Sequence, residues 1–161
     1  MSTIRRTYSC KKQGELRQSM GMVHRHLLLN EIIQNARKLK QIVLIGDTNI
    51  DRHTWVSIVS KLRTEGWNYH LIDPLNASST LAGCSIHATL EEIEDDTGCI
   101  LLMDTSQKDQ WIQLITQRME VRGDVELIWS QPGCEIDEND VKDFHVYGWS
   151  FIRNEALLDY L

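Results

Sequence analysis

The sequence predicts an α/β domain of three layers. A doubly wound, mainly parallel five-stranded sheet carries helices on both faces, and an extra helix lies at the N-terminus. Five short apolar runs alternate along the chain with segments whose apolar residues recur every three or four positions. The runs are almost continuously apolar, as expected for strands buried on both faces. Strands that alternate with helices form right-handed crossovers, which build a parallel sheet.

The N-terminal helix is predicted over about residues 15–38. Its apolar residues recur at three- and four-residue steps and would line one face of a helix. We divide the chain here into a basic N-terminal arm or helix, residues 1–26, and a Rossmann-like domain, residues 27–161. The first apolar residues of the pattern are Leu16, Met20, Val23 and Leu27.

The five strands and their helices follow in order. Gly66 ends the helix after the first strand, and Pro74 closes the second strand. The predicted strands are residues 41–46, 67–74, 99–104, 124–133 and 145–149. The predicted helices between and after them lie at about residues 55–66, 90–96, 111–123, 137–144 and 151–161.

The composition is that of a globular protein without a membrane anchor. A chain of 161 residues fits one domain, and its 42% apolar content is ordinary for such a domain. No apolar run approaches the roughly 18 residues that a membrane span requires. The four cysteines form no C-x-x-C pair, which argues against a zinc site. We therefore expect a cytoplasmic protein with reduced thiols and no bound metal.

Charge is unevenly distributed along the chain. Residues 1–40 hold nine Lys and Arg against two Glu, a net charge of +7, whereas the other 121 residues carry −13. A basic arm on an acidic body can dock on its own body, on a second subunit or on nucleic acid. The acidic body would repel a phosphate backbone everywhere except at the arm, which argues against nucleic acid.

In a doubly wound sheet, ligands bind beyond the carboxyl ends of the strands, where the strand order reverses. The residues that follow the first four predicted strands are therefore the candidates for a site. They occupy positions 46–54, 73–76, 103–107 and 130–134.

The turn after the first strand carries an ordered set of small, hydroxyl and basic residues. A short helix leads straight into this strand in "NEIIQNARKLKQIVLIG". After the strand come Gly46, Thr48, Arg52, Thr54 and Trp55. A glycine, a hydroxyl group and a helix start suit a phosphate, because main-chain amides and the helix dipole attract an anion.

Three later segments extend this pattern. Asp73-Pro74 closes the second strand, "GCSIHATLEEI" follows at residues 83–93, and the fourth strand ends in "LIWSQPG". In this order, over about residues 27–158, the chain resembles the small cytosolic CoA-binding proteins. These are single Rossmann-like domains akin to the CoA-binding part of succinyl-CoA synthetase. The family binds its ligand without a well-established reaction, so the resemblance implies CoA or acyl-CoA as ligand and no catalytic residue.

The resemblance also implies roles for residues near the strand ends. Gly46 would let the backbone approach the pyrophosphate, and amides at the helix start near Arg52 would donate to phosphate oxygens. Asp73 would accept from a ribose hydroxyl, while Met103 and Asp104 would edge the adenine slot. The cofactor-binding candidates are Gly46, Asp47, Thr48, Arg52, His53, Thr54, Asp73, Pro74, Met103, Asp104 and Gln131.

Two acids in the first turn, Asp47 and Asp51, depart from the family's pattern. A carboxylate about 6 Å from a phosphate costs on the order of 2–3 kcal/mol at an effective dielectric constant of 20. Binding therefore requires these acids to point away or to be neutralised by Arg52 or His53. Without a ligand, Arg52 would pair with one of the acids and Asp104 would cap the next helix.

Two further functions fit parts of the pattern. Asp47, Asp104 and Ser130 follow three strands as in a receiver domain, where such acids bind Mg²⁺ and accept a phosphoryl group. A receiver also needs a lysine after its last strand, and "HVYGW" has none. The other alternative is a Rossmann-like scaffold without a ligand, which forms a homo-oligomer or docks a partner through the basic N-terminal helix.

Overall fold

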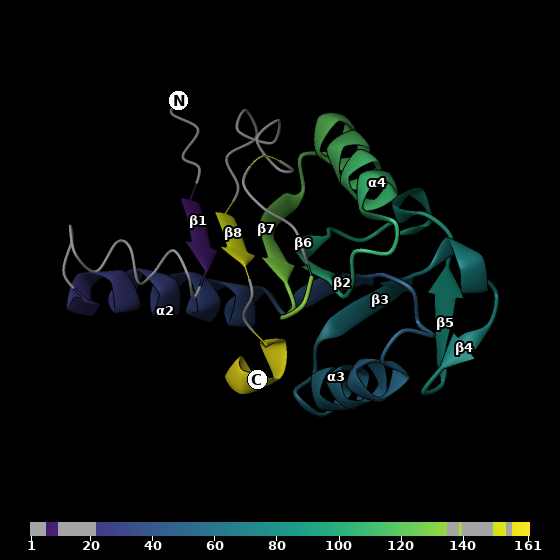
Figure 1. Ribbon diagram of the computed structural model, residues 1–161, viewed down its shortest axis with the longest axis horizontal. Coiled ribbons are helices and arrows are strands. Elements are labelled where there is room, and N and C mark those ends of the chain that lie inside the picture. The colour runs from purple at the N-terminus through teal and green to yellow at the C-terminus, as the bar shows by residue number, and fades with distance from the viewer. Residues whose placement is uncertain (1–5, 10–21, 135–138, 140–149, 154–155) are drawn as a thin grey trace.

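The computed structural model describes residues 6–9, 22–134, 139, 150–153 and 156–161. Within these residues the chain forms three layers, with a mainly parallel sheet between helices on its two faces (Figure 1). The predicted α/β, doubly wound fold class is therefore confirmed.

Among the described residues, the sheet has eight strands in the order β1-β8-β7-β6-β2-β3-β5-β4. Neighbouring strands pair in parallel except β4, which is antiparallel to β5. Numbered along the chain, the six strands from β5 to β8 have the order 3-2-1-4-5-6 of the Rossmann fold. The strands are β1 (Arg6–Ser9), β2 (Gln41–Ile45), β3 (Asn68–Ile72), β4 (Thr80–Leu81), β5 (Cys84–His87), β6 (Gly98–Leu102), β7 (Val125–Ser130) and β8 (Ser150–Arg153).

Helices cover both faces of the sheet. The helices α2 (Met22–Leu39) and α3 (Arg52–Thr64) pack on one face, together with the 3-10 helix η4 (Leu157–Tyr160). The helix α4 (Lys108–Val121) and the 3-10 helix η2 (Leu90–Glu92) pack on the other. A further 3-10 helix, η1 (Pro74–Asn76), follows β3 directly.

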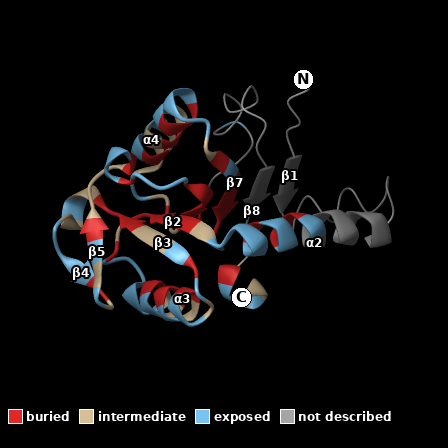
Figure 2. Ribbon diagram, turned by 180° about the vertical axis from the view of Figure 1, so that it is seen from behind, coloured by how far each residue is buried: buried red, intermediate tan, exposed pale blue. Residues whose placement is uncertain are grey.

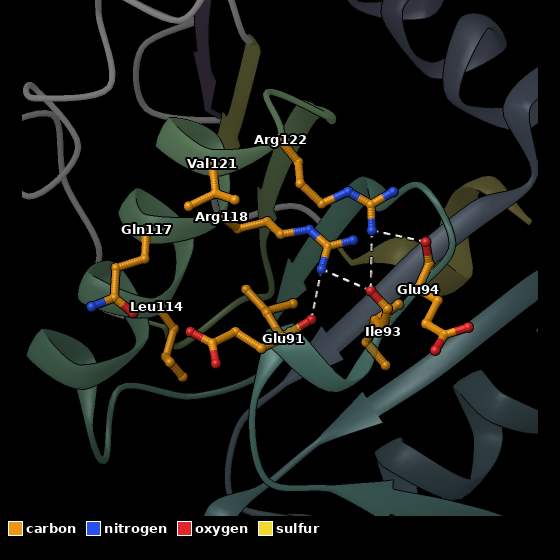
Figure 3. A pocket seen from close by; sticks show the side chains of 9 residues that line it. Glu91, Ile93, Glu94, Leu114, Gln117, Arg118, Val121 and Arg122 are labelled. Atoms are coloured by element: carbon orange, nitrogen blue, oxygen red, sulfur yellow. Dashed lines mark hydrogen bonds between the residues drawn. The ribbon is translucent and has the colours of Figure 1, made fainter.

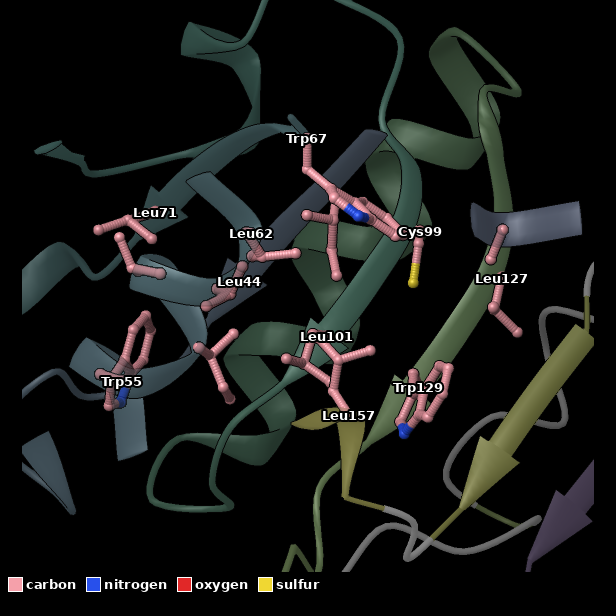
Figure 4. Packing of buried hydrophobic residues seen from close by; sticks show 14 of the residues in the cluster. Leu44, Trp55, Leu62, Trp67, Leu71, Cys99, Leu101, Leu127, Trp129 and Leu157 are labelled. Carbon is pink, nitrogen blue, oxygen red and sulfur yellow. The ribbon is translucent and has the colours of Figure 1, made fainter. Parts of the chain in front are cut away.

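The core consists of two apolar clusters separated by the sheet. Successive residues of a strand point to opposite faces, so Ile42 and Leu44 of β2 join the α2 and α3 side, and Val43 and Ile45 join the α4 side. Figure 2 shows this burial along the central strands and on the inner sides of α3 and α4. Figure 4 shows the first cluster, in which the fully buried Trp55 lies near Leu44. Burying one large apolar side chain contributes about 1.5–3 kcal/mol.

The structure differs from the prediction in its number of strands. Five were predicted, but β4 and β5 form an unpredicted hairpin over residues 80–87. Ala82 and Gly83 form its turn with φ of 50° and 81°, as in the two-residue turns that favour hairpins. The strands are only two and four residues long, too short to show a period in the sequence.

The predicted helix over residues 151–161 is wrong. Residues 150–153 form β8, which pairs with both β1 and β7, and only 157–160 are helical, as the 3-10 helix η4. Phe151 and Ile152 favour strands, and two neighbouring strands offer them hydrogen bonds. The predicted helix at 90–96 is likewise limited to the 3-10 turn 90–92. Residues 145–149 and most of 137–144 lie outside the described residues.

The N-terminal arm is partly continuous with the domain. Its residues 6–9 form the edge strand β1, and α2 runs without interruption across the predicted boundary between residues 26 and 27. Figure 1 shows the beginning of α2 projecting past β1, beyond the edge of the sheet. The start of the predicted helix at residue 15 lies outside the described residues.

Candidate functional site

The strand order reverses between β2 and β6. From β2 the chain crosses to β3 on one side, and from β6 it crosses to β7 on the other. The last residues of the two strands, Ile45 and Leu102, are paired, and the amide of Met103 donates to the Ile45 carbonyl at 2.9 Å. This is the position at which a doubly wound sheet opens its ligand crevice.

Gly46 directly follows β2 at this position and is buried. Its amide donates to the Ile72 carbonyl of β3 at 3.2 Å. A Cβ atom at this position would overlap Oδ2 of Asp104 and would lie 2.9 Å from Cβ of Met103 and 3.2 Å from Cζ2 of Trp55. The absence of a side chain at Gly46 therefore admits the Asp104 carboxylate into the space where a phosphate was expected to approach.

Asp104 joins the first turn to the turn after β6. Its Oδ2 accepts a hydrogen bond of 2.7 Å from the Asp47 amide. Its Oδ1 accepts from the amide of Ser106 at 2.9 Å and from the Ser106 hydroxyl. The side chain does not cap α4, which begins two residues after Ser106 without a capping side chain. Asp104 instead bridges two turns at the bottom of the crevice.

Asp73 holds the next residue of the first turn in the same way. Oδ2 of Asp73 accepts from the amide and the hydroxyl of Thr48, both at 2.8 Å, and from Nδ2 of Asn76 at 2.6 Å. Its Oδ1 accepts from the Leu75 amide at 3.0 Å. Burial alone would raise the pKa of Asp73, but these hydrogen bonds to the charged form outweigh burial and lower the pKa below its usual value.

The two carboxylates accept hydrogen bonds from main-chain amides of the first turn. The amides of Asp47 and Thr48 are neighbouring donors, and each donates to a carboxylate from another strand end. The oxygens of Asp73 that the resemblance would direct to a ribose accept from Thr48, Leu75 and Asn76 instead. The first turn is therefore satisfied by the chain's own negative charges.

The start of α3 lies beside this closed turn and is exposed. Arg52 and His53 are both exposed, and no carboxylate among the described residues pairs with Arg52. Asp51 precedes them with a left-handed backbone, φ 51°, and its carboxylate accepts from the Thr54 hydroxyl at 2.7 Å. Within the described part of the chain, no acceptor meets the main-chain N–H groups of residues 51–53. Among the described residues, the start of α3 therefore carries main-chain donors that have no protein acceptor.

The remaining candidates lie around the turn or face away from it. Pro74 is the first residue of η1, and Met103 is half-buried beside Gly46. Gln131 follows β7 and donates its amide to the Leu102 carbonyl. Its side-chain Oε1 accepts from the Leu157 amide at 2.8 Å, so this side chain fastens η4 to the sheet. The structure thus groups the Gly46 turn with strand ends 73 and 103–104, and it turns the side chain of Gln131 toward η4.

A second polar group, not predicted from the sequence, lies under α4. Arg118 and Asp124 form an ion pair of 2.9 Å with side-chain exposures of only 4% and 7%. Arg118 also donates to the carbonyls of Leu90 and Ile93 at 2.7 and 2.8 Å. Burial would raise the pKa of Asp124, but the Arg118 guanidinium and the Thr97 amide lower it. Arg118 lies among the buried residues of α4, three residues after Ile115. A charged residue at an otherwise apolar position of a helix is the sequence feature that could have predicted this buried ion pair.

A pocket of about 340 Å³ lies above this ion pair, between α4 and the segment 90–94. Figure 3 shows Leu114, Gln117 and Val121 projecting from α4 on one side and Glu91, Ile93 and Glu94 on the other. Its volume is in the range of sites for small molecules or peptide side chains. The pocket is separate from the crevice at Gly46.

The described residues also limit other kinds of site. No three His, Cys, Asp or Glu side chains among them are grouped so that they could hold a metal ion. None of the helices in the described ranges has both the length and the apolar character needed to cross a bilayer.

The helices on both sheet faces and the reversal of strand order between β2 and β6 define a Rossmann-like α/β domain. Models of known protein families and curated proteins give no match to the sequence. Solved structures do share the fold. A hypothetical protein from Pyrococcus horikoshii OT3 has a TM-score of 0.66 at 14% identity, covering 81% of this chain and 87% of that one.

Two further solved structures are similar. The protein cell-free ID.343 from Thermus thermophilus has a TM-score of 0.64 at 15% identity, over 83% of this chain and 94% of its own. A conserved hypothetical protein from Pyrococcus furiosus has a TM-score of 0.59 at 16% identity, over 75% and 98%. At these identities the similarity establishes the fold and leaves the ligand open.

Proposed function

We propose that this chain is a non-catalytic, Rossmann-like scaffold of the CoA-binding type, in which the anion site of the first turn is filled by the protein itself. One observation carries the proposal. The neighbouring amides of Asp47 and Thr48 donate to the carboxylates of Asp104 and Asp73 at 2.7 and 2.8 Å. Because both amides already donate to carboxylates, they are not available as donors to a pyrophosphate.

The energetics favour the internal arrangement. A phosphate that displaced either carboxylate would leave a buried charged acceptor without its donors, which costs about 1–3 kcal/mol or more. A phosphate beside them would meet two negative charges, each costing on the order of 2–3 kcal/mol at about 6 Å. One exposed arginine and a helix end, worth about 0.3–1 kcal/mol, do not offset both.

A second candidate function rests on a different observation. The N–H groups at the start of α3 are open, and Arg52 and His53 are exposed beside them. A CoA phosphate bound at this helix end would not require the turn amides. The chain would then bind the nucleotide through α3 alone, more weakly than a complete phosphate turn.

Thermal unfolding with millimolar CoA distinguishes the two functions. A ligand present at 100 times its Kd stabilises a protein by about 2.7 kcal/mol. The scaffold proposal predicts no change in Tm for the wild type and a CoA-dependent rise for Asp104→Ser, which frees the Asp47 amide and removes one charge. Asp109→Ser, which removes an exposed carboxylate from α4, is the matched control and should not respond.

Arg52→Ala shows which part of the chain is responsible for any rise in Tm. A rise in the wild-type Tm that Arg52→Ala abolishes would support binding at the start of α3 and would contradict the ligand-free scaffold. A rise that Arg52→Ala leaves intact, together with none added by Asp104→Ser, would show that the closed turn does not limit binding.

A further inference from the structure

The pocket beside α4 combines an apolar floor with an acidic rim. Leu90, Ile93 and Leu114 line it together with Val121, whose side chain is 82% exposed. A large apolar side chain this exposed, at the edge of a concave surface, is typical of a contact site rather than of a core. We call this surface the α4 groove.

The rim of the α4 groove carries uncompensated negative charge. Arg118 is paired with Asp124, and Arg122 with Asp96. Within the described ranges, no cation or hydrogen-bond donor meets the side-chain carboxylates of Glu91 and Glu94. Figure 3 shows these carboxylates at different sides of the groove, one toward Leu114 and one beyond Ile93. The groove is therefore complementary to an apolar segment flanked by two or more positive charges.

The sequence of this chain contains such a segment. Residues 10–21, "CKKQGELRQSMG", hold Lys11, Lys12 and Arg17 against a single acid, and they lie outside the described residues. Leu16 and Met20 are four positions apart and would share one face of a helix. The segment offers both features that the α4 groove requires.

We propose that the α4 groove binds residues 10–21 of a second copy of this chain. The inference rests on the proposed scaffold function, since it supplies the partner that such a scaffold needs. The segment of the same copy is attached to β1 at Ser9 and to α2 at Met22, and α2 lies on the face opposite α4. Figure 1 shows β1 and the start of α2 together at the end of the molecule away from β4 and β5.

Sedimentation equilibrium of the full chain tests this pairing by charge reversal. Lys11→Glu/Lys12→Glu should weaken the dimer about tenfold or more, because exposed ion pairs that become repulsive each contribute a few-fold. Adding Glu91→Lys/Glu94→Lys should restore the wild-type Kd to within about threefold of its value. Val121→Asp, at a site open to solvent, should weaken the dimer without changing the circular-dichroism spectrum of the folded chain.

The control variant introduces two lysines in place of glutamates outside the α4 groove. Glu31→Lys/Glu126→Lys alters two exposed carboxylates outside the groove and should not rescue the Lys11→Glu/Lys12→Glu variant. A monomeric wild type, or a dimer indifferent to these reversals, would overturn the proposal. A monomer whose Tm falls in Lys11→Glu/Lys12→Glu and recovers in the fourfold variant would place the segment in its own groove, and this also overturns it. The CoA experiment remains informative in every case, because it reports on the Gly46 turn and the start of α3, neither of which lines the α4 groove.

Discussion

The amide nitrogen of Asp47 lies 2.7 Å from Oδ2 of Asp104, although 57 residues separate the two in the chain. This contact crosses the point where the strand order reverses, between the ends of β2 and β6. Together with the hydrogen bond from the Thr48 amide to Asp73, it provides both neighbouring amides of the first turn with an acceptor from the protein itself.

Gly46→Ala should destabilise the protein by about 1–3 kcal/mol, as overpacking of a filled site does. The added Cβ would overlap Oδ2 of Asp104 and press on Met103, whose Cβ would be 2.9 Å away. Urea unfolding measures the loss. In an Asp104→Ala background the loss should shrink, because part of the overlap is gone. Equal losses in both backgrounds would show that the carboxylate does not fill this space.

Acidification should destabilise the protein through Asp73. Its folded-state pKa is lowered, so its contribution is complete above its unfolded pKa of about 3.9 and is lost as the pH falls through the folded value. Asp73→Asn should lower stability at pH 7 by about 1–3 kcal/mol, because one acceptor oxygen is replaced by a donor. Between about pH 5 and pH 2.5 its urea midpoint should fall less than that of the wild type. A parallel fall in both proteins would exclude Asp73 as a source of the pH dependence.

Arg118→Met should cost about 3–5 kcal/mol, because it removes the closer of the two arginines that pair with the buried Asp124 carboxylate. It also removes the donors to the Leu90 and Ile93 carbonyls, which shape the α4 groove. Arg122→Met is the control, since Arg122 reaches the same segment from the surface and should cost less than about 1 kcal/mol. Chemical denaturation that ranked the two variants equally would contradict the structure.

The cysteines should differ in reactivity toward an alkylating reagent. Burial raises the pKa of the Cys99 thiol strongly, and this side chain is 2% exposed in β6. Burial also raises the pKa of the half-buried Cys84, where the Arg63 charge acts in the opposite direction. Peptide mapping after brief labelling should find Cys84 modified and Cys99 protected until urea unfolds the chain. Labelling of Cys99 in the native protein at the rate of Cys84 would show that β6 is not in the core.

The central strands and the two central helices could be predicted from the sequence because their signals are local. The run from Gln41 to Ile45 is apolar on both faces, and the stripe from Trp55 to Leu62 has the helical period. The C-terminal segment was ambiguous, since its apolar residues fit either a strand or a helix. Only pairing with β7 and β1, which are distant in sequence, makes residues 150–153 a strand.

The convergence of the strand ends could be predicted from the sequence, but the hydrogen bonds that close the first turn could not. The carboxyl ends of parallel strands meet at one edge, which brings positions 46–48, 73 and 104 together. The inward direction of Asp73 and Asp104 depends on side-chain rotamers and on strand register. The sequence shows that the two acids are present, but it does not show their rotamers or the register of the strands. The acids that argued against a phosphate from the sequence are Asp47 and Asp51, whereas the acids that accept from the turn amides are Asp104 and Asp73.

A ¹H–¹⁵N NMR titration of the wild-type protein with CoA tests the central claim most directly, because it reports on the Asp47 and Thr48 amides individually. We predict that both resonances of the wild type stay in place when CoA is added to millimolar concentration. When CoA is added to the variants, the Asp47 resonance should move in Asp104→Ser and the Thr48 resonance should move in Asp73→Asn. Saturable shifts of both amides when CoA is added to the wild type would contradict the account.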